Sequence, residues 1–338
     1  MMSRAEVAVI GAGLSGLALA SMLQADETDV IVFEARDRAG GRVLSQGGFD
    51  LGPAWLWPHN TRLLSLARNL GLSVFAQHSA GNLVFENEQG QIRRDLAMAT
   101  MGDALRIEGG LSTVTNALAQ KLGSRLHLNK AVNAIEERND EVIIETGDVK
   151  LMAGRAVLAL PPRLMTKLGV KARDVPTWMA GHAKLVARYP TPFWREMGLN
   201  GDAISHCGPL AEIHDASPYD LSDGALFGFA VPGAASAPDF KTRSVEQLVR
   251  LFGSGAAAPT DVLVKDWSAD PFTATGDDKT LPTTHPHYQP QHATHRLFFA
   301  GSENAAANGG FLEGAFEAAE AVYRQLNEMK AWKRKTAS

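Results

Sequence analysis

The hydrophobic pattern of the first forty residues predicts a strand, a helix and a second strand in direct succession. Residues 5–10 form a short apolar run bounded by glycine, which is typical of a buried strand. An apolar stretch from residue 14 to about residue 24 predicts a helix, and residues 29–33 predict the second strand. This order of elements is typical of an α/β domain that is built on a parallel sheet.

The pattern continues with further strands and helices toward the C-terminus. An amphipathic helix closed by Gly71 is predicted at residues 60–72, and strands are predicted at residues 126–132, 141–145, 157–160 and 296–303. Asn139 and Asp140 lie where a hairpin would turn. A last helix follows Gly310, and its apolar positions fall on one face: Leu312, Ala315, Phe316, Ala319, Val322, Tyr323 and Leu326. We interpret this face as core.

Residues 11–16 (GAGLSG) join the first strand to the first helix and match the G-x-G-x-x-G pattern of dinucleotide sites. Gly11 permits the tight turn, Gly13 lets the backbone approach a pyrophosphate, and Gly16 allows the helix to pack closely on the strand. The free N–H groups at Leu14 and Ser15 favour phosphate oxygens.

Glu34 ends the second strand and can accept hydrogen bonds from an adenosine ribose. A carboxylate at this position disfavours a 2′-phosphate, which makes NADP a poor candidate. The choice between FAD and NAD stays open at this point.

Composition and charge restrict the class of protein. A chain of 338 residues predicts two domains. The net charge of −4 gives no reason to expect a nucleic acid as partner, and the single Cys207 fits a reducing compartment, so we expect a cytoplasmic protein. We expect no signal peptide, because the N-terminal residues lack an apolar region followed by a small-residue cleavage site. We expect no membrane span, because the sequence has no run of about 18 apolar residues. Residues 331–338 predict a flexible tail.

Residues 34–42 (EARDRAGGR) decide between the two cofactors. They resemble the E-x-R-x-x-x-G-G-R segment of the flavin-containing amine oxidase family, which includes monoamine, polyamine and L-amino-acid oxidases. The resemblance implies FAD as cofactor. It also implies that Ala35, Arg36, Gly41 and Arg42 surround its adenosine and pyrophosphate, and the planar guanidinium of Arg42 suits phosphate oxygens. A solvated surface arginine is the alternative for Arg36.

Further blocks of the chain resemble the same family. Residues 49–55 (FDLGPAW) resemble a segment whose backbone lies along the flavin, residues 106–122 resemble a helix of the family, and residues 157–162 resemble its A-x-P-P segment. Val132 lies where the family's backbone contacts adenine. The resemblance therefore adds these cofactor-binding residues: Gly52, Pro53, Ala54, Trp55, Val132 and Trp267.

Lys184 is the predicted catalytic residue. Residues 181–186 (GHAKLV) precede residues 192–194 (PFW) and resemble the stretch that holds the family's lysine, which binds a water against flavin N5. From alternation alone, Lys184 would be the exposed position of a strand. The PFW block favours the catalytic interpretation.

Residues 296–303 and 309–315 resemble the family's C-terminal block. There the last helix points its N-terminus at the flavin pyrimidine ring, where a helix dipole stabilises the reduced anion. The residues implied to contact FAD are Gly301, Ser302, Glu303, Gly310, Phe311, Leu312 and Ala315.

The sequence departs from the family in three respects. Only about thirty residues separate Phe75 from Arg106, where members usually carry a large helical insertion that roofs the substrate cavity. Phe311 matches one ring of the family's aromatic cage, but the second position falls on Asp277. Asp277 either faces an amine or belongs to a solvated turn. Gly276 stands where some members attach flavin to cysteine, so we expect non-covalent FAD.

The remaining cavity and metal predictions follow from these departures. The substrate cavity is predicted to contain Trp55, Trp57, Phe272, Asp277 and Phe311. We interpret the histidines between residues 283 and 295 as parts of a polar loop and expect no metal site.

The expected architecture is a Rossmann-type FAD-binding domain with an interleaved α+β substrate domain. The first would contain residues 1–76, 104–173 and 270–330, and the second residues 77–103 and 174–269. The resemblance implies amine oxidation by hydride transfer to flavin, with dioxygen or another acceptor regenerating the flavin. The alternatives are a flavin-dependent dehydrogenase or desaturase of a carbon skeleton, and a binding protein that holds FAD without turnover. The sequence leaves the oligomeric state open.

Overall fold

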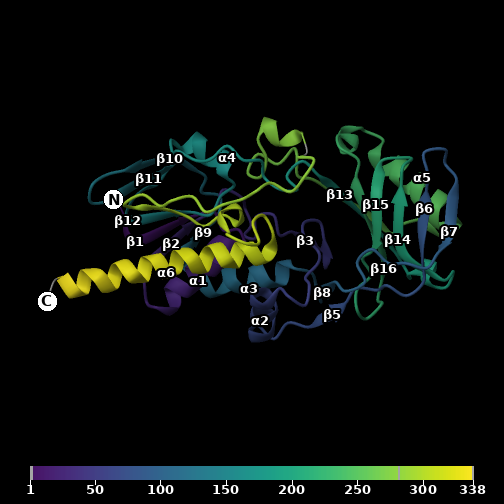
Figure 1. Cartoon of the computed structure of the whole chain (residues 1–338), viewed down its shortest axis with the longest axis horizontal. Helices are drawn as coiled ribbons and strands as arrows, with labels where there is room; N and C mark the ends of the chain where they lie inside the picture. Colours follow the sequence, from purple (N-terminus) through teal and green to yellow (C-terminus); the bar gives the residue numbers. More distant parts are fainter. Residues whose placement is uncertain (1–2, 281, 337–338) are drawn as a thin grey trace.

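The computed structural model describes residues 3–280 and 282–336, except for the side chains of residues 3 and 330–336. Two seven-stranded sheets lie toward opposite ends of the long axis of the molecule (Figure 1). The mixed α/β architecture predicted from the sequence is confirmed. The domain boundaries stay a proposal.

The first sheet has the strand order β10-β11-β12-β1-β2-β9, and β18 pairs with β12. Its central strands are parallel, and β10 and β11 form an antiparallel hairpin at one edge. The glycine turn follows β1 at the carboxyl edge of this sheet, the edge at which α/β sheets bind ligands. The strands are β1 (Ser3–Ile10), β2 (Val30–Phe33), β9 (Leu126–His127), β10 (Val132–Glu137), β11 (Val142–Thr146), β12 (Lys150–Leu158) and β18 (Leu297–Phe299).

Helices cover both faces of this sheet. On one face, α1 (Leu14–Ala25), α2 (Thr61–Asn69), α3 (Ser112–Leu122) and α6 (Leu312–Thr336) share one apolar core, with the long α6 running beside α1 (Figure 1). On the other face, α4 (Pro162–Met165) and the β10–β11 hairpin bury a second core. The sheet is buried on both faces, as parallel sheets generally are.

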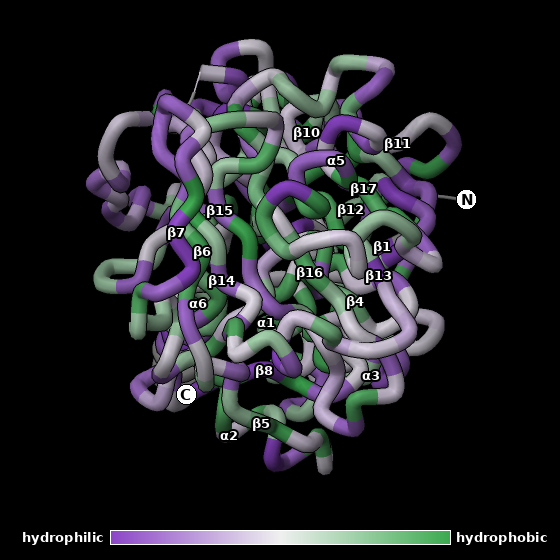
Figure 2. The backbone as a smooth tube through the Cα atoms, turned by 90° about the vertical axis from the view of Figure 1, so that its right-hand side faces the viewer, coloured by the Kyte–Doolittle hydropathy of each residue, from purple (hydrophilic) through white to green (hydrophobic). Residues whose placement is uncertain are grey.

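The second sheet has the order β17-β13-β16-β15-β14-β6-β7 and is mostly antiparallel. Figure 2 looks at the molecule from this end and shows hydrophilic residues on the edge strand β7. Charged side chains on an edge strand discourage pairing with another chain. The strands are β6 (Asn82–Glu86), β7 (Ile92–Leu96), β13 (Ala183–Tyr189), β14 (Leu199–Ser205), β15 (Leu210–Asp215), β16 (Gly224–Ala230) and β17 (Asp261–Asp266).

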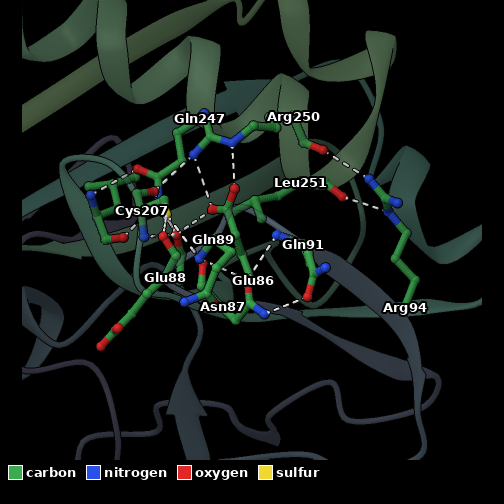
Figure 3. A network of polar contacts seen from close by, with 12 residues as sticks. Glu86, Asn87, Glu88, Gln89, Gln91, Arg94, Cys207, Gln247, Arg250 and Leu251 are labelled. Carbon is green, nitrogen blue, oxygen red and sulfur yellow. Dashed lines mark hydrogen bonds and ion pairs between the residues drawn. The ribbon is translucent and has the colours of Figure 1, made fainter.

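Helix α5 (Phe240–Phe252) is tied to this sheet by the polar network in Figure 3. Arg250 donates to both oxygens of the buried Glu86, at 2.6 and 3.0 Å. Gln247 donates to Ser205 Oγ, and Arg250 also donates to the carbonyl oxygen of Cys207. Cys207 therefore belongs to a hydrogen-bond network that joins α5 to the second sheet.

Shorter elements connect the two sheets. Two two-stranded antiparallel ribbons are formed by β3 (Ser45–Gln46) with β4 (Phe49–Asp50), which is a hairpin, and by β5 (Val74–Ala76) with β8 (Leu105–Ile107), which are distant in sequence. The short 3₁₀ helices are η1 (Gly123–Arg125), η2 (Thr166–Leu168), η3 (Phe193–Arg195), η4 (Ala234–Ser236), η5 (Ser254–Ala257), η6 (Gly276–Lys279) and η7 (Ser302–Asn304). Within the described residues, none of the helices combines the length and apolar character needed to cross a bilayer.

One local prediction differs from the structure, and one stays untested. The strand predicted at residues 126–132 is interrupted, because the N–H groups of Asn129 and Lys130 donate to the carbonyl oxygens of Arg36 and Glu34. The backbone of residues 331–336 continues α6, and the flexible tail expected at residues 331–338 stays a prediction. Residues 337–338 of the predicted tail lie outside the described residues.

Candidate active site

A cavity of about 990 Å³ lies between the edge of the first sheet and strands of the second. Residues that are distant in sequence meet there, including the glycine turn, β13 and the N-terminus of α6. The predicted site residues that line the cavity are Gly11, Gly13, Leu14, Ser15, Glu34, Ala35, Arg36, Gly41, Arg42, Gly52, Pro53, Ala54, Trp55, Trp57, Val132, Lys184, Trp267, Phe272, Gly301, Ser302, Gly310, Phe311, Leu312 and Ala315. Gly16, Glu303 and Asp277 do not line it.

The glycine turn fits a phosphate group. A methyl group added at Gly13 would meet no atom within 4 Å, so this backbone faces open space. Helix α1 has no side-chain cap, which leaves its first N–H groups free for an anion. Gly11 has a φ of 99°, a conformation that side chains rarely adopt.

Gly13 and Gly16 are expected to respond differently to alanine. A methyl group at Gly16 would lie 2.0 Å from the carbonyl oxygen of Gly11, so Gly16→Ala should lower the free energy of unfolding by about 1–3 kcal/mol. Gly13→Ala should leave folding intact and weaken FAD binding, because its methyl group enters the cavity. Urea unfolding and FAD titration of both variants separate the two effects. Equal loss of stability in both would contradict this assignment.

Glu34 stabilises the turn from the end of β2. Its Oε2 accepts the N–H of Ala12 at 2.8 Å, and its Oε1 accepts the N–H of Arg36 at 3.0 Å. The residue is only 3% exposed, yet it lines the cavity. Each carboxylate oxygen has a second lone pair, so Glu34 can still accept a ribose hydroxyl.

Arg42 lines the cavity and is held by two residues of the C-terminal block. Its Nη1 pairs with Glu303 Oε1 at 2.7 Å, and its Nη2 donates to Ser302 Oγ at 2.9 Å. Glu303 thus lies behind the cavity and orients Arg42. Arg36 also lines the cavity, but its Nη2 donates to Asp270 at 2.6 Å and to Thr273 at 2.8 Å. Arg36 therefore mainly links the segment that follows β2 to residues 270–273.

Lys184 lies on β13 and is buried, with 2% of its surface exposed. Its Nζ donates to the carbonyl oxygen of Gly52 at 3.1 Å and lies 3.7 Å from the centre of the Phe227 ring. Burial lowers the pKa of Lys184 to about 7, an effect that the nearby Asp50 opposes and Arg106 reinforces. At neutral pH a large share of this amine is therefore uncharged, whereas an exposed lysine is almost fully protonated.

Asp277 is the predicted cavity residue that the structure does not bring to the site. It is exposed on η6, whose capping box turns its neighbour Asp278 inward instead. Asp278 accepts the N–H of Thr177 at 2.9 Å and pairs with Arg163 at 2.8 Å. Of the two alternatives for Asp277, the solvated turn agrees with the structure.

The structure adds cavity residues that the sequence reasoning did not identify, among them Trp178, His182 and Phe229. Phe229 is the register partner of Lys184 in the β13–β16 ladder, so the two side chains share one face of the sheet. No local signal in the sequence specifies this register. Trp178 reaches the cavity from an irregular segment, which hydrophobic periodicity does not describe.

The carboxylates among the described cavity-lining residues, Glu34 and Glu313, are both engaged. Glu313 Oε1 accepts the N–H of Arg62 at 3.0 Å, and its Oε2 accepts the N–H of Leu63 at 3.3 Å, which caps the N-terminus of α2. Glu313 Oε1 also pairs with Arg62 Nη1 at 3.3 Å, and Glu34 Oε1 lies 3.6 Å from Arg36 Nη1, so the charge of each carboxylate already faces a guanidinium group.

The described residues contain no cluster of three histidine, cysteine, aspartate or glutamate side chains that could hold a metal ion. Cys207, the sole cysteine of the sequence, is not among the cavity-lining residues and offers no attachment point for a cofactor. The residues around the cavity thus fit a dinucleotide that is held without a covalent bond to cysteine.

Comparison with known proteins gives consistent results. The family model "Flavin containing amine oxidoreductase" matches residues 14–95 and 76–326. Amine oxidase [flavin-containing] B of Sus scrofa is 23% identical over 457 residues, with 96% of this chain and 86% of the pig protein covered. The alignment is longer than the 338 residues of this chain, so the pig protein contains segments that are missing here.

Two solved structures share the fold. Wild-type putrescine oxidase bound to putrescine superimposes with a TM-score of 0.81 at 20% identity, covering 97% of this chain and 100% of that chain. Cyclohexylamine oxidase from Brevibacterium oxydans IH-35A gives a TM-score of 0.80 at 20% identity, covering 96% and 99%.

Proposed function

The chain belongs to the flavin containing amine oxidoreductase family, and from this premise we propose that it oxidises an amine by hydride transfer to flavin N5. Its cofactor is FAD, and it is an FAD-dependent amine oxidase. The finer features of the reaction are our proposal: the hydride step, hydrolysis of the imine and dioxygen as acceptor. The cytoplasmic location suggested by the single cysteine stays a prediction.

The observation that carries this proposal is the buried Lys184 in the same cavity as the glycine turn. A lysine buried among aromatic rings is costly, since desolvation disfavours its charged form. Its pKa near 7 and its hydrogen bond to the Gly52 carbonyl hold an amine that can bind a water and exchange a proton. Such a group is typical of a functional site.

FAD, when bound, supplies the acceptor for a hydride from the carbon next to the amine nitrogen. Gly13, Glu34 and Arg42 would hold its phosphates and adenosine, and the N-terminus of α6 at Leu312 would stabilise negative charge. Lys184 positions a water and moves a proton. Phe229 and Trp55 exclude bulk water and favour the neutral amine over the ammonium.

Anaerobic mixing with amines tests the proposal. We expect benzylamine, cyclohexylamine or another amine of a panel to bleach the flavin absorbance, and readmitted air to restore it with formation of hydrogen peroxide. Silence across primary amines, polyamines and amino acids would instead favour a dehydrogenase or desaturase of carbon skeletons, or FAD binding without turnover. Reduction without reoxidation by air would point to another acceptor.

A further inference from the structure

Three aromatic rings form one row at the wall of the cavity; we refer to Trp178, His285 and Phe311 as the aromatic row. His285 stacks on Phe311 with ring centres 4.9 Å apart and planes inclined by 6°. The edge of His285 meets Trp178 at 4.9 Å and 63°. Trp178 and Phe311 both line the cavity, and His285 joins them. A substrate in the cavity can therefore contact the rings of Trp178 and Phe311, while the exposed His285 links these two rings from outside the cavity.

The row is held by hydrogen bonds from three segments of the chain. The hydroxyl of Tyr288, a buried residue, accepts the N–H of Trp178 at 2.9 Å and donates to the carbonyl oxygen of Pro176 at 2.6 Å. His285 Nε2 donates to the carbonyl oxygen of Gly309 at 3.0 Å. These bonds fix the rings before any ligand binds, which reduces the entropy cost of binding.

Gly310 permits this close arrangement. Its φ is 79°, and a methyl group there would lie 2.9 Å from the Tyr288 ring and 3.1 Å from Trp178 Cβ. The rings can approach the start of α6 only because this position carries no side chain. Close packing of Trp178 and Tyr288 against Gly310 therefore sets the position of the row. The Phe311 side chain is still 48% exposed.

The charges around the cavity restrict what the row can bind. The two lining carboxylates already face guanidinium groups: Glu34 Oε1 lies 3.6 Å from Arg36 Nη1, and Glu313 Oε1 pairs with Arg62 Nη1 at 3.3 Å. A second ammonium group on a substrate would lose its hydration here without gaining a free counter-ion. An aromatic or alicyclic body would instead gain contact with the rings.

We propose that Trp178 determines substrate specificity together with Phe311, and that the cavity selects amines with one amino group and an apolar ring. His285 acts as a positioning residue that holds the two rings in place. This inference rests on the proposed amine oxidation. It replaces Asp277, the residue that sequence matching places beside Phe311, by an aromatic residue from a different segment.

Stopped-flow reduction of the FAD-loaded enzyme tests the proposal, with benzylamine and putrescine as probes. The concentration dependence of the rate gives both a dissociation constant and a limiting rate. Trp178→Ala should weaken benzylamine binding about tenfold, or ~1.4 kcal/mol, and change the limiting rate less than twofold. Trp178→Phe should recover most of the binding. The wild type should bind putrescine at least tenfold more weakly than benzylamine.

His285 variants distinguish positioning from a general structural effect. His285→Ala should weaken benzylamine binding about fivefold, whereas His285→Phe, which keeps a stacking ring, should restore it. His287→Ala is the matched control, an exposed histidine of the same segment, and should behave as wild type. Unchanged binding in Trp178→Ala, a loss confined to the limiting rate, or tighter binding of putrescine would overturn the inference.

Failure of the amine chemistry itself can be recognised separately. If benzylamine leaves the wild-type flavin oxidised, the proposed function has failed. The perturbation of the flavin spectrum by benzyl alcohol, an uncharged ring compound, then still reports on the row. Trp178→Ala should weaken that perturbation about tenfold, and an equal response in both proteins would overturn the role of Trp178.

Discussion

Replacement of Lys184 by methionine is expected to slow anaerobic flavin reduction by about 10²–10⁴-fold, the range typical for loss of a general acid–base group. Methionine fills a similar volume and tolerates the aromatic surroundings of Phe227 and Phe229. FAD should stay bound, because the residues proposed to hold its phosphates and adenosine, Gly13, Glu34 and Arg42, are unchanged. Stopped-flow absorbance with benzylamine measures the limiting rate directly.

The pH profile gives an independent test of the same residue. The pKa of Lys184 is lowered to about 7, so its neutral form dominates above pH 7. Only that form can accept a proton through a bound water, so the limiting rate should rise between pH 6 and pH 8. Lys184→Met should lose this rise.

Lys265 provides the control for Lys184. It is the register partner of Lys184 on β17 and does not line the cavity. Its Nζ instead pairs with Asp270 at 2.7 Å. Lys265→Met should keep both the rate and the pH profile. An unchanged reduction rate in Lys184→Met would remove Lys184 from the mechanism.

Replacement of Arg42 by alanine is expected to damage both stability and cofactor binding. The side chain of Glu303 is fully buried and pairs with Arg42, so removal of Arg42 should lower the free energy of unfolding by about 3–5 kcal/mol. Loss of a charged hydrogen bond to phosphate, worth about 1.5–3 kcal/mol, should weaken FAD binding roughly 10–100-fold. Urea unfolding and flavin fluorescence titration measure the two effects.

Two variants control for charge and for position. Arg42→Lys keeps the positive charge but loses the planar guanidinium. It should therefore lose less stability and less FAD affinity than Arg42→Ala. Arg93→Ala removes an exposed pair with Asp95 on the edge strand β7 and should change stability by less than about 0.5 kcal/mol. If Arg42→Ala bound FAD as tightly as the wild type, the assignment of Arg42 to the phosphates would have to be abandoned.

Much of the cofactor side of the site could be predicted from the sequence because its chemistry is local. Gly11, Gly13 and Gly16 lie within one turn, and their backbone requirements can be inferred from spacing alone. Lys184 was found through resemblance to a family and not through alternation, which would have placed it in solvent. The structure places Lys184 in the interior, where its Nζ lies against the rings of Phe227 and Phe229.

The substrate side could not be predicted in the same way. An ungapped match placed Asp277 in the cavity, but the 3₁₀ turn of η6 buries Asp278 and leaves Asp277 exposed. The sequence predicts a polar loop for the histidines of residues 283–295, but it gives no sign that one of them, His285, stacks on Phe311. Contacts between segments more than a hundred residues apart, such as Trp178 with Tyr288, have no signature in either segment.

The sequence by itself determined the α/β class, the cofactor family and the position of the glycine turn, because each depends on hydrophobic periodicity or on a few adjacent residues. Only the tertiary structure decided which side chains surround the amine. Strand register sets Phe229 beside Lys184, and packing against Gly310 brings Trp178 to the wall. Register and packing arise from the sum of many weak contacts over the whole molecule, so no short stretch of sequence specifies them.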